Sequence, residues 1–281
     1  MDAELVREHY SKPIVRQEII RFSRGRWLAA TSGTTWIRYV GRKPLTINSL
    51  DLPDFMLRRG CRSLYATTSI YRRLRTREDP FSEDNVVAVT PYLDIDNRIE
   101  NWKATIFMAL EVVKELERLG IERSVYVLWS GKGAHVRVHE RAISHELRGL
   151  DSAWALAEYV KLKVEDKLIE ARNRYGAKDL RVENQLKPRS LFTVPLTIHR
   201  KIDRIAICMR PEKLDEFELS WSEPGAFIHD ASWSEYEEGE ADNAVLEALS
   251  KVGGYPLHRY SNKRKEPTVE EMIRRWLDSK G

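Results

Sequence analysis

Two aspartates, two positions apart, follow an apolar run near the middle of the chain. Residues 86–93 are largely apolar, and Asp94 and Asp96 come directly after them. On a strand, residues i and i+2 point to the same side, so the two carboxylates would face the same way. Such a pair repels itself unless a cation lies between the charges, and hard oxygen ligands select Mg²⁺ or Mn²⁺. The pair therefore fits either a divalent-metal site or the solvent-exposed end of a strand.

A glycine-rich turn with the sequence SGKG spans residues 130–133 and leads to His135. Its backbone N–H groups and Lys132 could meet phosphate oxygens, with Ser130 and His135 at the two edges of the turn. Most turns of this composition have no ligand. His135 and His139 could also act as paired metal ligands, but two histidines without a third local ligand seldom form a zinc site. We therefore expect His139 to be a surface residue.

A third polar segment runs from 182 to 203. It contains the acidic Glu183 and, after a predicted strand, the cationic group His199, Arg200 and Lys201. Basic side chains grouped in this way can hold a triphosphate through charge-assisted hydrogen bonds. The alternative is a basic turn between two strands.

The composition limits what kind of protein can present these groups. The chain has 281 residues, of which 42% are hydrophobic and 32% charged, and its net charge is +4. These values exclude wholesale disorder, and no uninterrupted apolar stretch is long enough to span a membrane. The two cysteines, Cys61 and Cys208, can build neither a disulfide framework nor a four-cysteine zinc site, and we expect both to be buried thiols. The simplest expectation is a cytoplasmic protein with no membrane partner.

Alternating and helical periodicities predict the elements that position these residues. Residues 1–24 read as helical, 27–48 as short strands, and 63–70 as a further strand. A βαβ-like passage follows, with a strand at 86–96, a helix at 97–120 and a strand at 124–129. Further elements are a strand at 134–140, a helix at 151–173, strands at 191–197 and 204–209, and a helix starting at the capping box of 268–271.

In this order, the three polar segments resemble the three motifs of the archaeo-eukaryotic primase superfamily, closest to the small catalytic subunit of DNA primase. The motifs are a strand ending in Asp-x-Asp, a Ser-Gly turn followed by a histidine, and Pro-x-x-x-His-x-Lys. The segments EHYSKPIVRQEIIRF (8–22) and LYATTSIYRRL (64–74) resemble the same subunit, so the likeness covers about residues 7–210.

The resemblance implies an α+β fold. It implies a primase-type core with mixed or antiparallel sheets, including an RRM-like catalytic module, flanked by helices. We expect one catalytic domain over 1–235, followed by an acidic linker and a C-terminal helical appendage over 236–281.

The resemblance also implies roles for individual residues. Asp94 and Asp96 would be metal-binding catalytic aspartates for Mg²⁺ or Mn²⁺. Ser130 and His135 would contact the phosphates of the incoming nucleotide, and His199 with Lys201 would hold the same triphosphate from the other side.

The third carboxylate is where the chain departs from the family pattern. Glu183 is the best candidate for this metal ligand, although the family usually has aspartate and a shorter spacing, so Asp179 and Asp203 stay open. The zinc knuckle common in primase small subunits cannot form from Cys61 and Cys208, so no zinc is expected.

The implied activity is template-directed nucleotidyl transfer on single-stranded DNA, from nucleoside triphosphates, by a two-metal mechanism. We expect the basic stretch YRRLRTR (71–77), with Arg72, Arg73 and Arg75, to contact the template. One alternative is an inactive primase-fold module that binds nucleic acid or acts as a scaffold. Another is a small-molecule nucleotidyltransferase or phosphoesterase. Whether a primase large subunit or another replication protein docks on the chain stays open.

Overall fold

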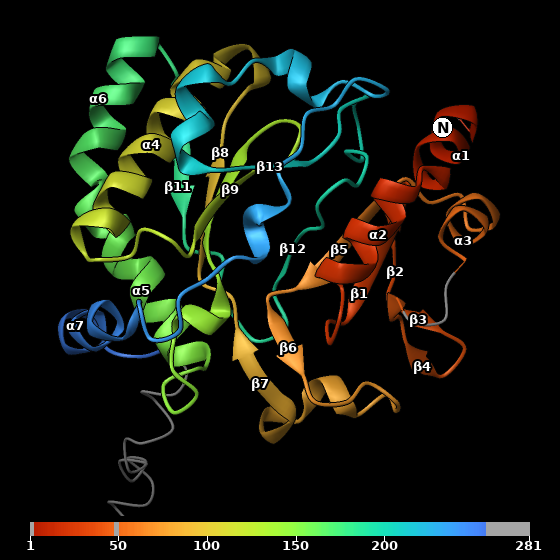
Figure 1. Ribbon diagram of the computed structural model, residues 1–281, viewed down its shortest axis with the longest axis horizontal. Helices are drawn as coiled ribbons and strands as arrows, with labels where there is room; N and C mark the ends of the chain where they lie inside the picture. The colour runs from red at the N-terminus through yellow and green to blue at the C-terminus, as the bar shows by residue number, and fades with distance from the viewer. Residues whose placement is uncertain (1–2, 48–50, 257–281) are drawn as a thin grey trace, which may run out of the picture.

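The N-terminal part of the fold is a pair of helices beside a small antiparallel sheet. The computed structural model describes residues 3–47 and 51–256 (Figure 1). Helix α1 (Ala3–Ser11) is followed by α2 (Pro13–Phe22), where proline occupies the first turn because its missing N–H needs no partner there. The sheet has the order β12-β5-β1-β2, formed by Leu191–Thr193, Ser63–Thr67, Leu28–Ser32 and Thr35–Ile37.

The second part is a five-stranded antiparallel sheet with the order β11-β8-β10-β9-β13. Its strands are β8 (Tyr92–Asp96), β9 (Val125–Trp129), β10 (Ala134–Val138), β11 (Arg181–Glu183) and β13 (Ile207–Met209). Its helices are α4 (Trp102–Arg118), α5 (Leu150–Lys163) and α6 (Glu165–Tyr175). The path β8-α4-β9-β10-α5/α6-β11 is a β-α-β-β-α-β unit with β8 and β9 on either side of β10. This confirms the predicted α+β class and the RRM-like module.

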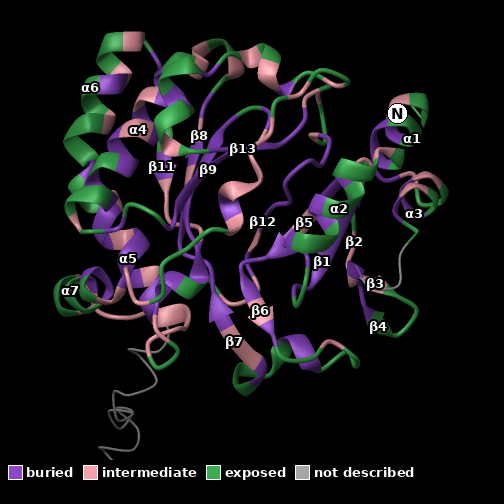
Figure 2. Ribbon diagram, viewed as in Figure 1, coloured by how far each residue is buried: buried purple, intermediate pink, exposed green. Residues whose placement is uncertain are grey.

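The two faces of this sheet differ in chemistry. Leu93, Ile95 and Val136 are buried on the face covered by α4 and α5. The alternate residues of β8, which include Asp94 and Asp96, point to the other face, toward the N-terminal part of the chain. Figure 2 shows the buried strands enclosed by helices whose outer surfaces are exposed.

The predicted strand at 86–96 is wrong in one respect, because it is two strands in two different sheets. β7 (Val86–Val89) pairs with β6 (Ser69–Tyr71), whereas β8 belongs to the five-stranded sheet. The break falls at Thr90 and Pro91. The Thr90 N–H still donates to the Thr68 carbonyl oxygen beside β6, whereas the Pro91 carbonyl oxygen accepts from Val138 of β10, so the chain changes sheets between these two residues. Proline has no N–H with which to extend the first ladder.

Other predicted elements are shorter than the sequence indicated. The helix expected at 151–173 is divided at Val164, a buried residue, into α5 and α6. The strand expected at 134–140 ends at Val138, and those at 191–197 and 204–209 shrink to β12 and β13 with one isolated bridge between Ile198 and Ile205.

The remaining elements complete the described chain. A two-stranded ribbon joins β3 (Tyr39–Val40) to β4 (Lys43–Pro44), α3 spans Leu52–Arg58, and α7 spans Asp242–Val252. Short 3-10 helices lie at Asp79–Phe81, Glu83–Asn85, Ile99–Asn101, Glu140–Ala142, Pro211–Glu216, Leu219–Ser222 and Ala231–Ser234.

The segment after residue 235 packs on the main body where it is described. Helix α7 lies against α5, and the Glu240 carboxylate accepts hydrogen bonds from the backbone N–H groups of Glu122, Arg123 and Ser124. The predicted helix that starts at 268 lies outside the described residues, and the boundary at 235 stays a prediction. Among the helices of residues 3–47 and 51–256, none has the length and apolar character needed to cross a membrane.

Candidate active site

Asp94 lies at the centre of a polar row that crosses three strands. In the antiparallel ladders, Asp94 on β8 is directly opposite His135 on β10 and Glu183 on β11. Directly opposed residues share one face of a sheet, so the three side chains lie side by side. His135 Nε2 is 3.3 Å from Asp94 Oδ1. The fold thus joins residues from the first, second and third polar segments of the sequence.

Asp96 extends the acidic group by one step along β8. Burial, together with the charges of Asp94 and Glu183, raises the pKa of Asp96, although His135 and Arg181 oppose the shift. Repulsion between adjacent carboxylates in a partly buried place is the situation that a bound divalent cation relieves. The donor set of Asp94 and Asp96 therefore fits Mg²⁺ or Mn²⁺.

Arg137 contacts the His135 ring at Nδ1, the nitrogen that does not face Asp94. Its Nη2 lies 2.8 Å from His135 Nδ1 and donates to the Thr193 carbonyl oxygen at 2.7 Å. Arg137 is fully buried, and its guanidinium lies 4.0 Å from the centre of the Phe192 ring. Because a guanidinium can only donate, Nδ1 must accept, and the proton of a neutral ring is on Nε2, which faces Asp94.

The SGKG turn, between β9 and β10, packs against both β8 and the loop at 199–204. The backbone N–H of Ser130 donates to the Gly133 carbonyl oxygen at 2.8 Å, which closes the turn. A Cβ atom on Gly133 would come within 2.5 Å of the Ile95 carbonyl oxygen, and one on Gly131 within 3.0 Å of His199 Cβ. Both glycines are therefore required by close approach, which brings Lys132 beside the loop at 199–204.

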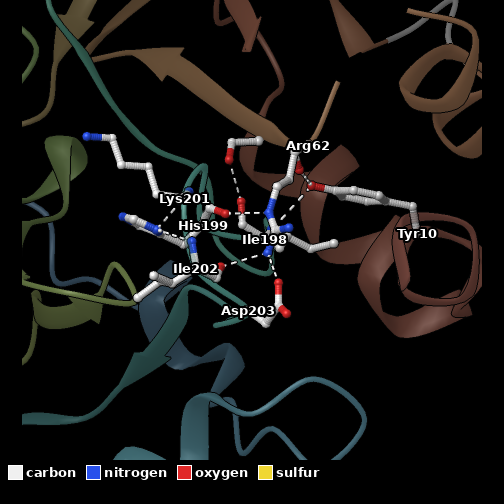
Figure 3. Close-up of polar contacts among 8 residues, drawn as sticks. Tyr10, Arg62, Ile198, His199, Lys201, Ile202 and Asp203 are labelled. Atoms are coloured by element: carbon white, nitrogen blue, oxygen red, sulfur yellow. Dashed lines mark hydrogen bonds and ion pairs between the residues drawn. The ribbon is translucent and has the colours of Figure 1, made fainter. Parts of the chain in front are cut away.

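Arg62 shapes that cationic loop (Figure 3). Its Nε donates to the His199 carbonyl oxygen at 2.7 Å and its Nη2 to the Ile202 carbonyl oxygen at 2.8 Å, and it also forms an ion pair with Asp203. Figure 3 shows the Lys201 side chain extending away from this network. The bonds of Arg62 fix the backbone of the loop and leave the Lys201 ammonium available for an anion.

His199 carries its proton in the same way as His135. Its Nδ1 accepts from the backbone N–H groups of Lys201 at 3.2 Å and Ile202 at 3.3 Å. Burial, with the nearby Arg200 and Arg62 charges, lowers the pKa of His199 to about 4, so the ring is neutral at pH 7. His199 is thus a neutral donor through Nε2, and the contact of Arg137 with Nδ1 likewise leaves Nε2 as the donor nitrogen of His135.

The alternative third carboxylates are engaged elsewhere. Asp179 forms an ion pair with Arg98 at 2.5 Å, and Asp203 pairs with Arg62. Glu183 faces Asp94 across the ladder, but its Oε2 accepts from Gln185 at 2.8 Å. Across residues 3–47 and 51–256, no group of three or more His, Cys, Asp or Glu side chains is arranged to hold a metal ion. Asp94 and Asp96 are therefore a pair of carboxylates, and no third side chain completes a metal-ligand group with them in the described part of the chain.

Arg72, Arg73 and Arg75 follow β6, and Arg73 pairs with Asp79 at 3.1 Å, away from the carboxylate row.

The expectation that His139 is a surface residue is wrong. It is only 8% exposed and stacks on Tyr236 with ring centres 4.5 Å apart, and burial lowers its pKa. Cys61 and Cys208 are buried free thiols, as expected.

Two residues of the site escaped sequence reasoning. Arg137 lies two positions after His135 on β10 and shares its face. The signal for it in the sequence was a charged residue on the inward face of an otherwise apolar strand. Arg62 gave no signal, because its partners are about 140 positions away.

The assembled groups divide by charge. The carboxylates of β8 and β11 lie on one side of the site. Lys132 of the SGKG turn, His199 and Lys201 lie on the other side. Such a site can bind a divalent cation together with the phosphates of a nucleotide.

Comparison with solved structures supports the fold. The polymerase domain of Mycobacterium tuberculosis Ligase D in complex with DNA superposes with a TM-score of 0.53 at 12% identity, covering 90% of each chain. The archaeo-eukaryotic primase (AEP) domain of the cyanophage S-2L primase-polymerase gives a TM-score of 0.36 at 14% identity, over 73% of this chain and 96% of that domain. No family model and no curated protein matches the sequence. The chain has the fold of the Ligase D polymerase domain.

Proposed function

We propose that this protein is a template-directed nucleotidyltransferase that synthesises or extends primers on single-stranded DNA from nucleoside triphosphates. The observation that supports this most strongly is the contact between Asp94 and His135, on adjacent strands, beside the turn whose Gly131 packs against His199. The DNA-bound polymerase domain with the same fold supports the choice of DNA as the partner.

Asp94 and Asp96, with Glu183 as the third ligand, would hold Mg²⁺ or Mn²⁺. When bound, the ions lower the pKa of the attacking 3′-hydroxyl and neutralise charge on the triphosphate. For Glu183 to join them, its carboxylate must leave Gln185 and turn toward Asp94.

The protein's own groups position the triphosphate. Lys132 and Lys201 supply positive charge, while His199 donates its Nε2–H to a phosphate oxygen. For His135 to do the same, its Nε2–H must leave Asp94 Oδ1, 3.3 Å away, when the metal takes up that carboxylate. Because Arg137 and the loop backbone already occupy both Nδ1 atoms, the rings do not reorient when the nucleotide binds. The Ser130 hydroxyl, which donates to the Gly133 carbonyl oxygen at 3.1 Å, would have to turn from that oxygen to donate to a phosphate.

A second function has one observation in its favour. Because no three-ligand metal group is preformed in the described part of the chain, an inactive primase-fold module that binds nucleic acid or acts as a scaffold is the alternative. The presence of the Asp94 and Asp96 pair and of both Nε2–H donors opposes this alternative, because binding nucleic acid without catalysis requires neither.

The test is primer synthesis and extension on single-stranded DNA with labelled nucleotides and Mg²⁺ or Mn²⁺. We expect product from the wild type and at least a 100-fold loss in Asp94→Asn and Asp96→Asn, because each removes a ligand charge. Asp166→Asn, an exposed aspartate of α6, is the matched control and should keep full activity. Product from both site variants would overturn the metal assignment, and DNA binding without product from the wild type would favour the scaffold.

Glu183 needs its own experiment because three carboxylates compete for the role. Glu183→Gln should abolish product while DNA binding persists, whereas Asp179→Asn should stay active. A fully active Glu183→Gln would remove this residue from the metal site.

A further inference from the structure

Three contacting aromatic rings, with an arginine at each end, lie near β6 and β7, the strands at the bottom of Figure 1. We define the arginine–aromatic strip as Arg189, Phe81, Trp27, Tyr39 and Arg77. The Arg189 guanidinium lies 4.8 Å from the Phe81 ring centre, and Arg77 lies 5.0 Å from that of Tyr39. Ring centres are 5.9 Å apart for Trp27 and Phe81 and 5.3 Å apart for Trp27 and Tyr39. Trp27 meets both neighbouring rings edge to face, at interplanar angles of 61° and 63°, so the strip is a continuous run of contacting flat groups.

Phe81 is the exposed ring of the strip. It is 55% exposed, whereas Trp27 beneath it is 3% exposed. Phe81 lines both a pocket of about 260 Å³, with Tyr71 and Arg189 among others, and a second pocket, with Tyr39 and Arg77 among others. Phe81 therefore borders two hollows that could each receive a planar group.

The backbone at Arg189 is strained. The Ser190 N–H donates to the Lys187 carbonyl oxygen at 3.0 Å, which closes a turn with Pro188 second and Arg189 third. Arg189 has φ = 62°, a conformation that normally requires glycine at the third position of such a turn. Strain of this kind suggests a role for the side chain that the conformation presents.

Charge complementarity indicates the occupant. The stretch 71–77 continues from the pocket wall at Tyr71 and adds Arg72 and Arg75. Asp79, in the loop after this stretch, pairs with Arg73 and accepts from the N–H groups of Arg75 and Thr76. The two pockets are lined by Arg77, Arg148 and Arg189 and by two glutamates, Glu78 and Glu83, so the arginines of 71–77 supply most of the excess positive charge near the strip.

We propose that the arginine–aromatic strip binds single-stranded DNA, with a base stacked on Phe81 and the flanking phosphates held by arginines. Unpaired bases expose the π-faces that such a platform needs, and duplex bases do not. The inference rests on the proposed function, because the strand bound here would be the template. The pocket includes Val86 and Val89 of β7, and the chain then runs into β8, so the strip lies toward the start of the strand that ends at Asp96.

Fluorescence anisotropy with a labelled deoxythymidine oligonucleotide, without metal or nucleotide, tests the strip apart from catalysis. Phe81→Ala should weaken binding by about 5- to 100-fold, the usual cost of losing one base–aromatic stack. Ile169→Ala is the matched control, because Ile169 is 52% exposed on α6 and lies outside the strip. It should bind as the wild type does.

Arg189→Gly separates binding from folding. Glycine relieves the positive φ, so the melting temperature should hold or rise while affinity falls and the salt dependence weakens by about one ion. Arg174→Ala removes another arginine that stacks on an aromatic ring, Tyr175, and should leave affinity unchanged.

Three outcomes would overturn the proposed role of the strip. They are a wild type that binds no single-stranded DNA, a Phe81→Ala variant that binds as tightly as Ile169→Ala, or duplex DNA that competes as well as single-stranded DNA. Crosslinking of a 5-iodouridine oligonucleotide to Phe81 or Tyr39 would support it directly. Asp94→Asn should bind like the wild type, so loss of synthesis with intact strip binding would count against the proposed catalysis alone.

Discussion

Arg137 Nη2 lies 2.8 Å from His135 Nδ1, with the guanidinium fully buried against Phe192. Among the described residues, Arg137 Nε and Nη1 have no hydrogen-bond partner. A buried cation in this position is costly, so the contact with His135 and the Thr193 carbonyl oxygen must compensate in part. The consequence is a His135 ring whose Nε2–H is directed at Asp94.

We expect Arg137→Met to act through His135. Methionine suits the aromatic surroundings but cannot donate to Nδ1, so the KM for nucleotide should rise by about tenfold or more, the usual value of a charged hydrogen bond. ¹⁵N shifts of the His135 ring should show a mixture of tautomers. In a His135→Ala background the Arg137→Met effect should vanish, and additive losses would contradict the link.

Asp96 should limit stability when no metal is present. Its folded pKa is raised, so its ionised form is disfavoured in the folded protein, and stability is lost as the pH rises through that pKa. Asp96→Asn should therefore raise the melting temperature at pH 7 without metal. Mg²⁺ at about 100 times its Kd should stabilise the wild type by about 2.7 kcal/mol and this variant by less. Equal shifts in both proteins would argue against metal binding at Asp96.

His9 should make the fold sensitive to acid. Burial lowers its pKa to about 4, and its Nε2 donates to the Leu196 carbonyl oxygen at 2.7 Å. Because the unfolded chain binds a proton below about pH 6.5 and the folded chain does not until about pH 4, stability falls as the pH drops through this window. Urea unfolding should show a loss of roughly 2 kcal/mol from His9 between pH 7.5 and 5. His9→Gln should remove that part of the loss, and an unchanged pH dependence would contradict it.

The buried ion pair of Arg26 and Glu140 should be needed for stability. Arg26 Nη2 lies 3.1 Å from Glu140 Oε2, and Arg26 Nη1 also donates to the Thr67 and Thr68 carbonyl oxygens at 2.9 Å. Burial alone would raise the pKa of Glu140, but Arg26 and hydrogen bonds hold it at about 2. Arg26→Met should cost about 3–5 kcal/mol of unfolding free energy, because it leaves a buried carboxylate unpaired.

A second substitution checks that cause. In the Arg26→Met background, Glu140→Leu should recover much of the loss by removing the unpaired charge. If denaturant unfolding shows no recovery, the cost arises from the lost carbonyl contacts of Arg26 instead.

Much of the site was predictable from local patterns. Strand alternation indicated that Asp94 and Asp96 share a face, and the resemblance carried by the three polar segments implied the α+β class. Alternation is a local property, and it persists because each strand has one side that must be buried.

Tertiary structure decided what those patterns left open. Only strand pairing places Glu183 opposite Asp94, and only the ion pairs with Arg98 and Arg62 engage Asp179 and Asp203 elsewhere. The division of 86–96 between two sheets likewise depends on remote partners, because Thr90 bonds to Thr68 and Pro91 to Val138.

By itself, then, the sequence determined which residues could do chemistry and on which elements they lie. Which of them meet, which histidine nitrogen carries the proton, and which carboxylate stands beside the aspartate pair were decided by the tertiary structure. The physical reason is that hydrogen bonds and ion pairs depend on distances between atoms, and distances between remote residues are set only when the sheets assemble.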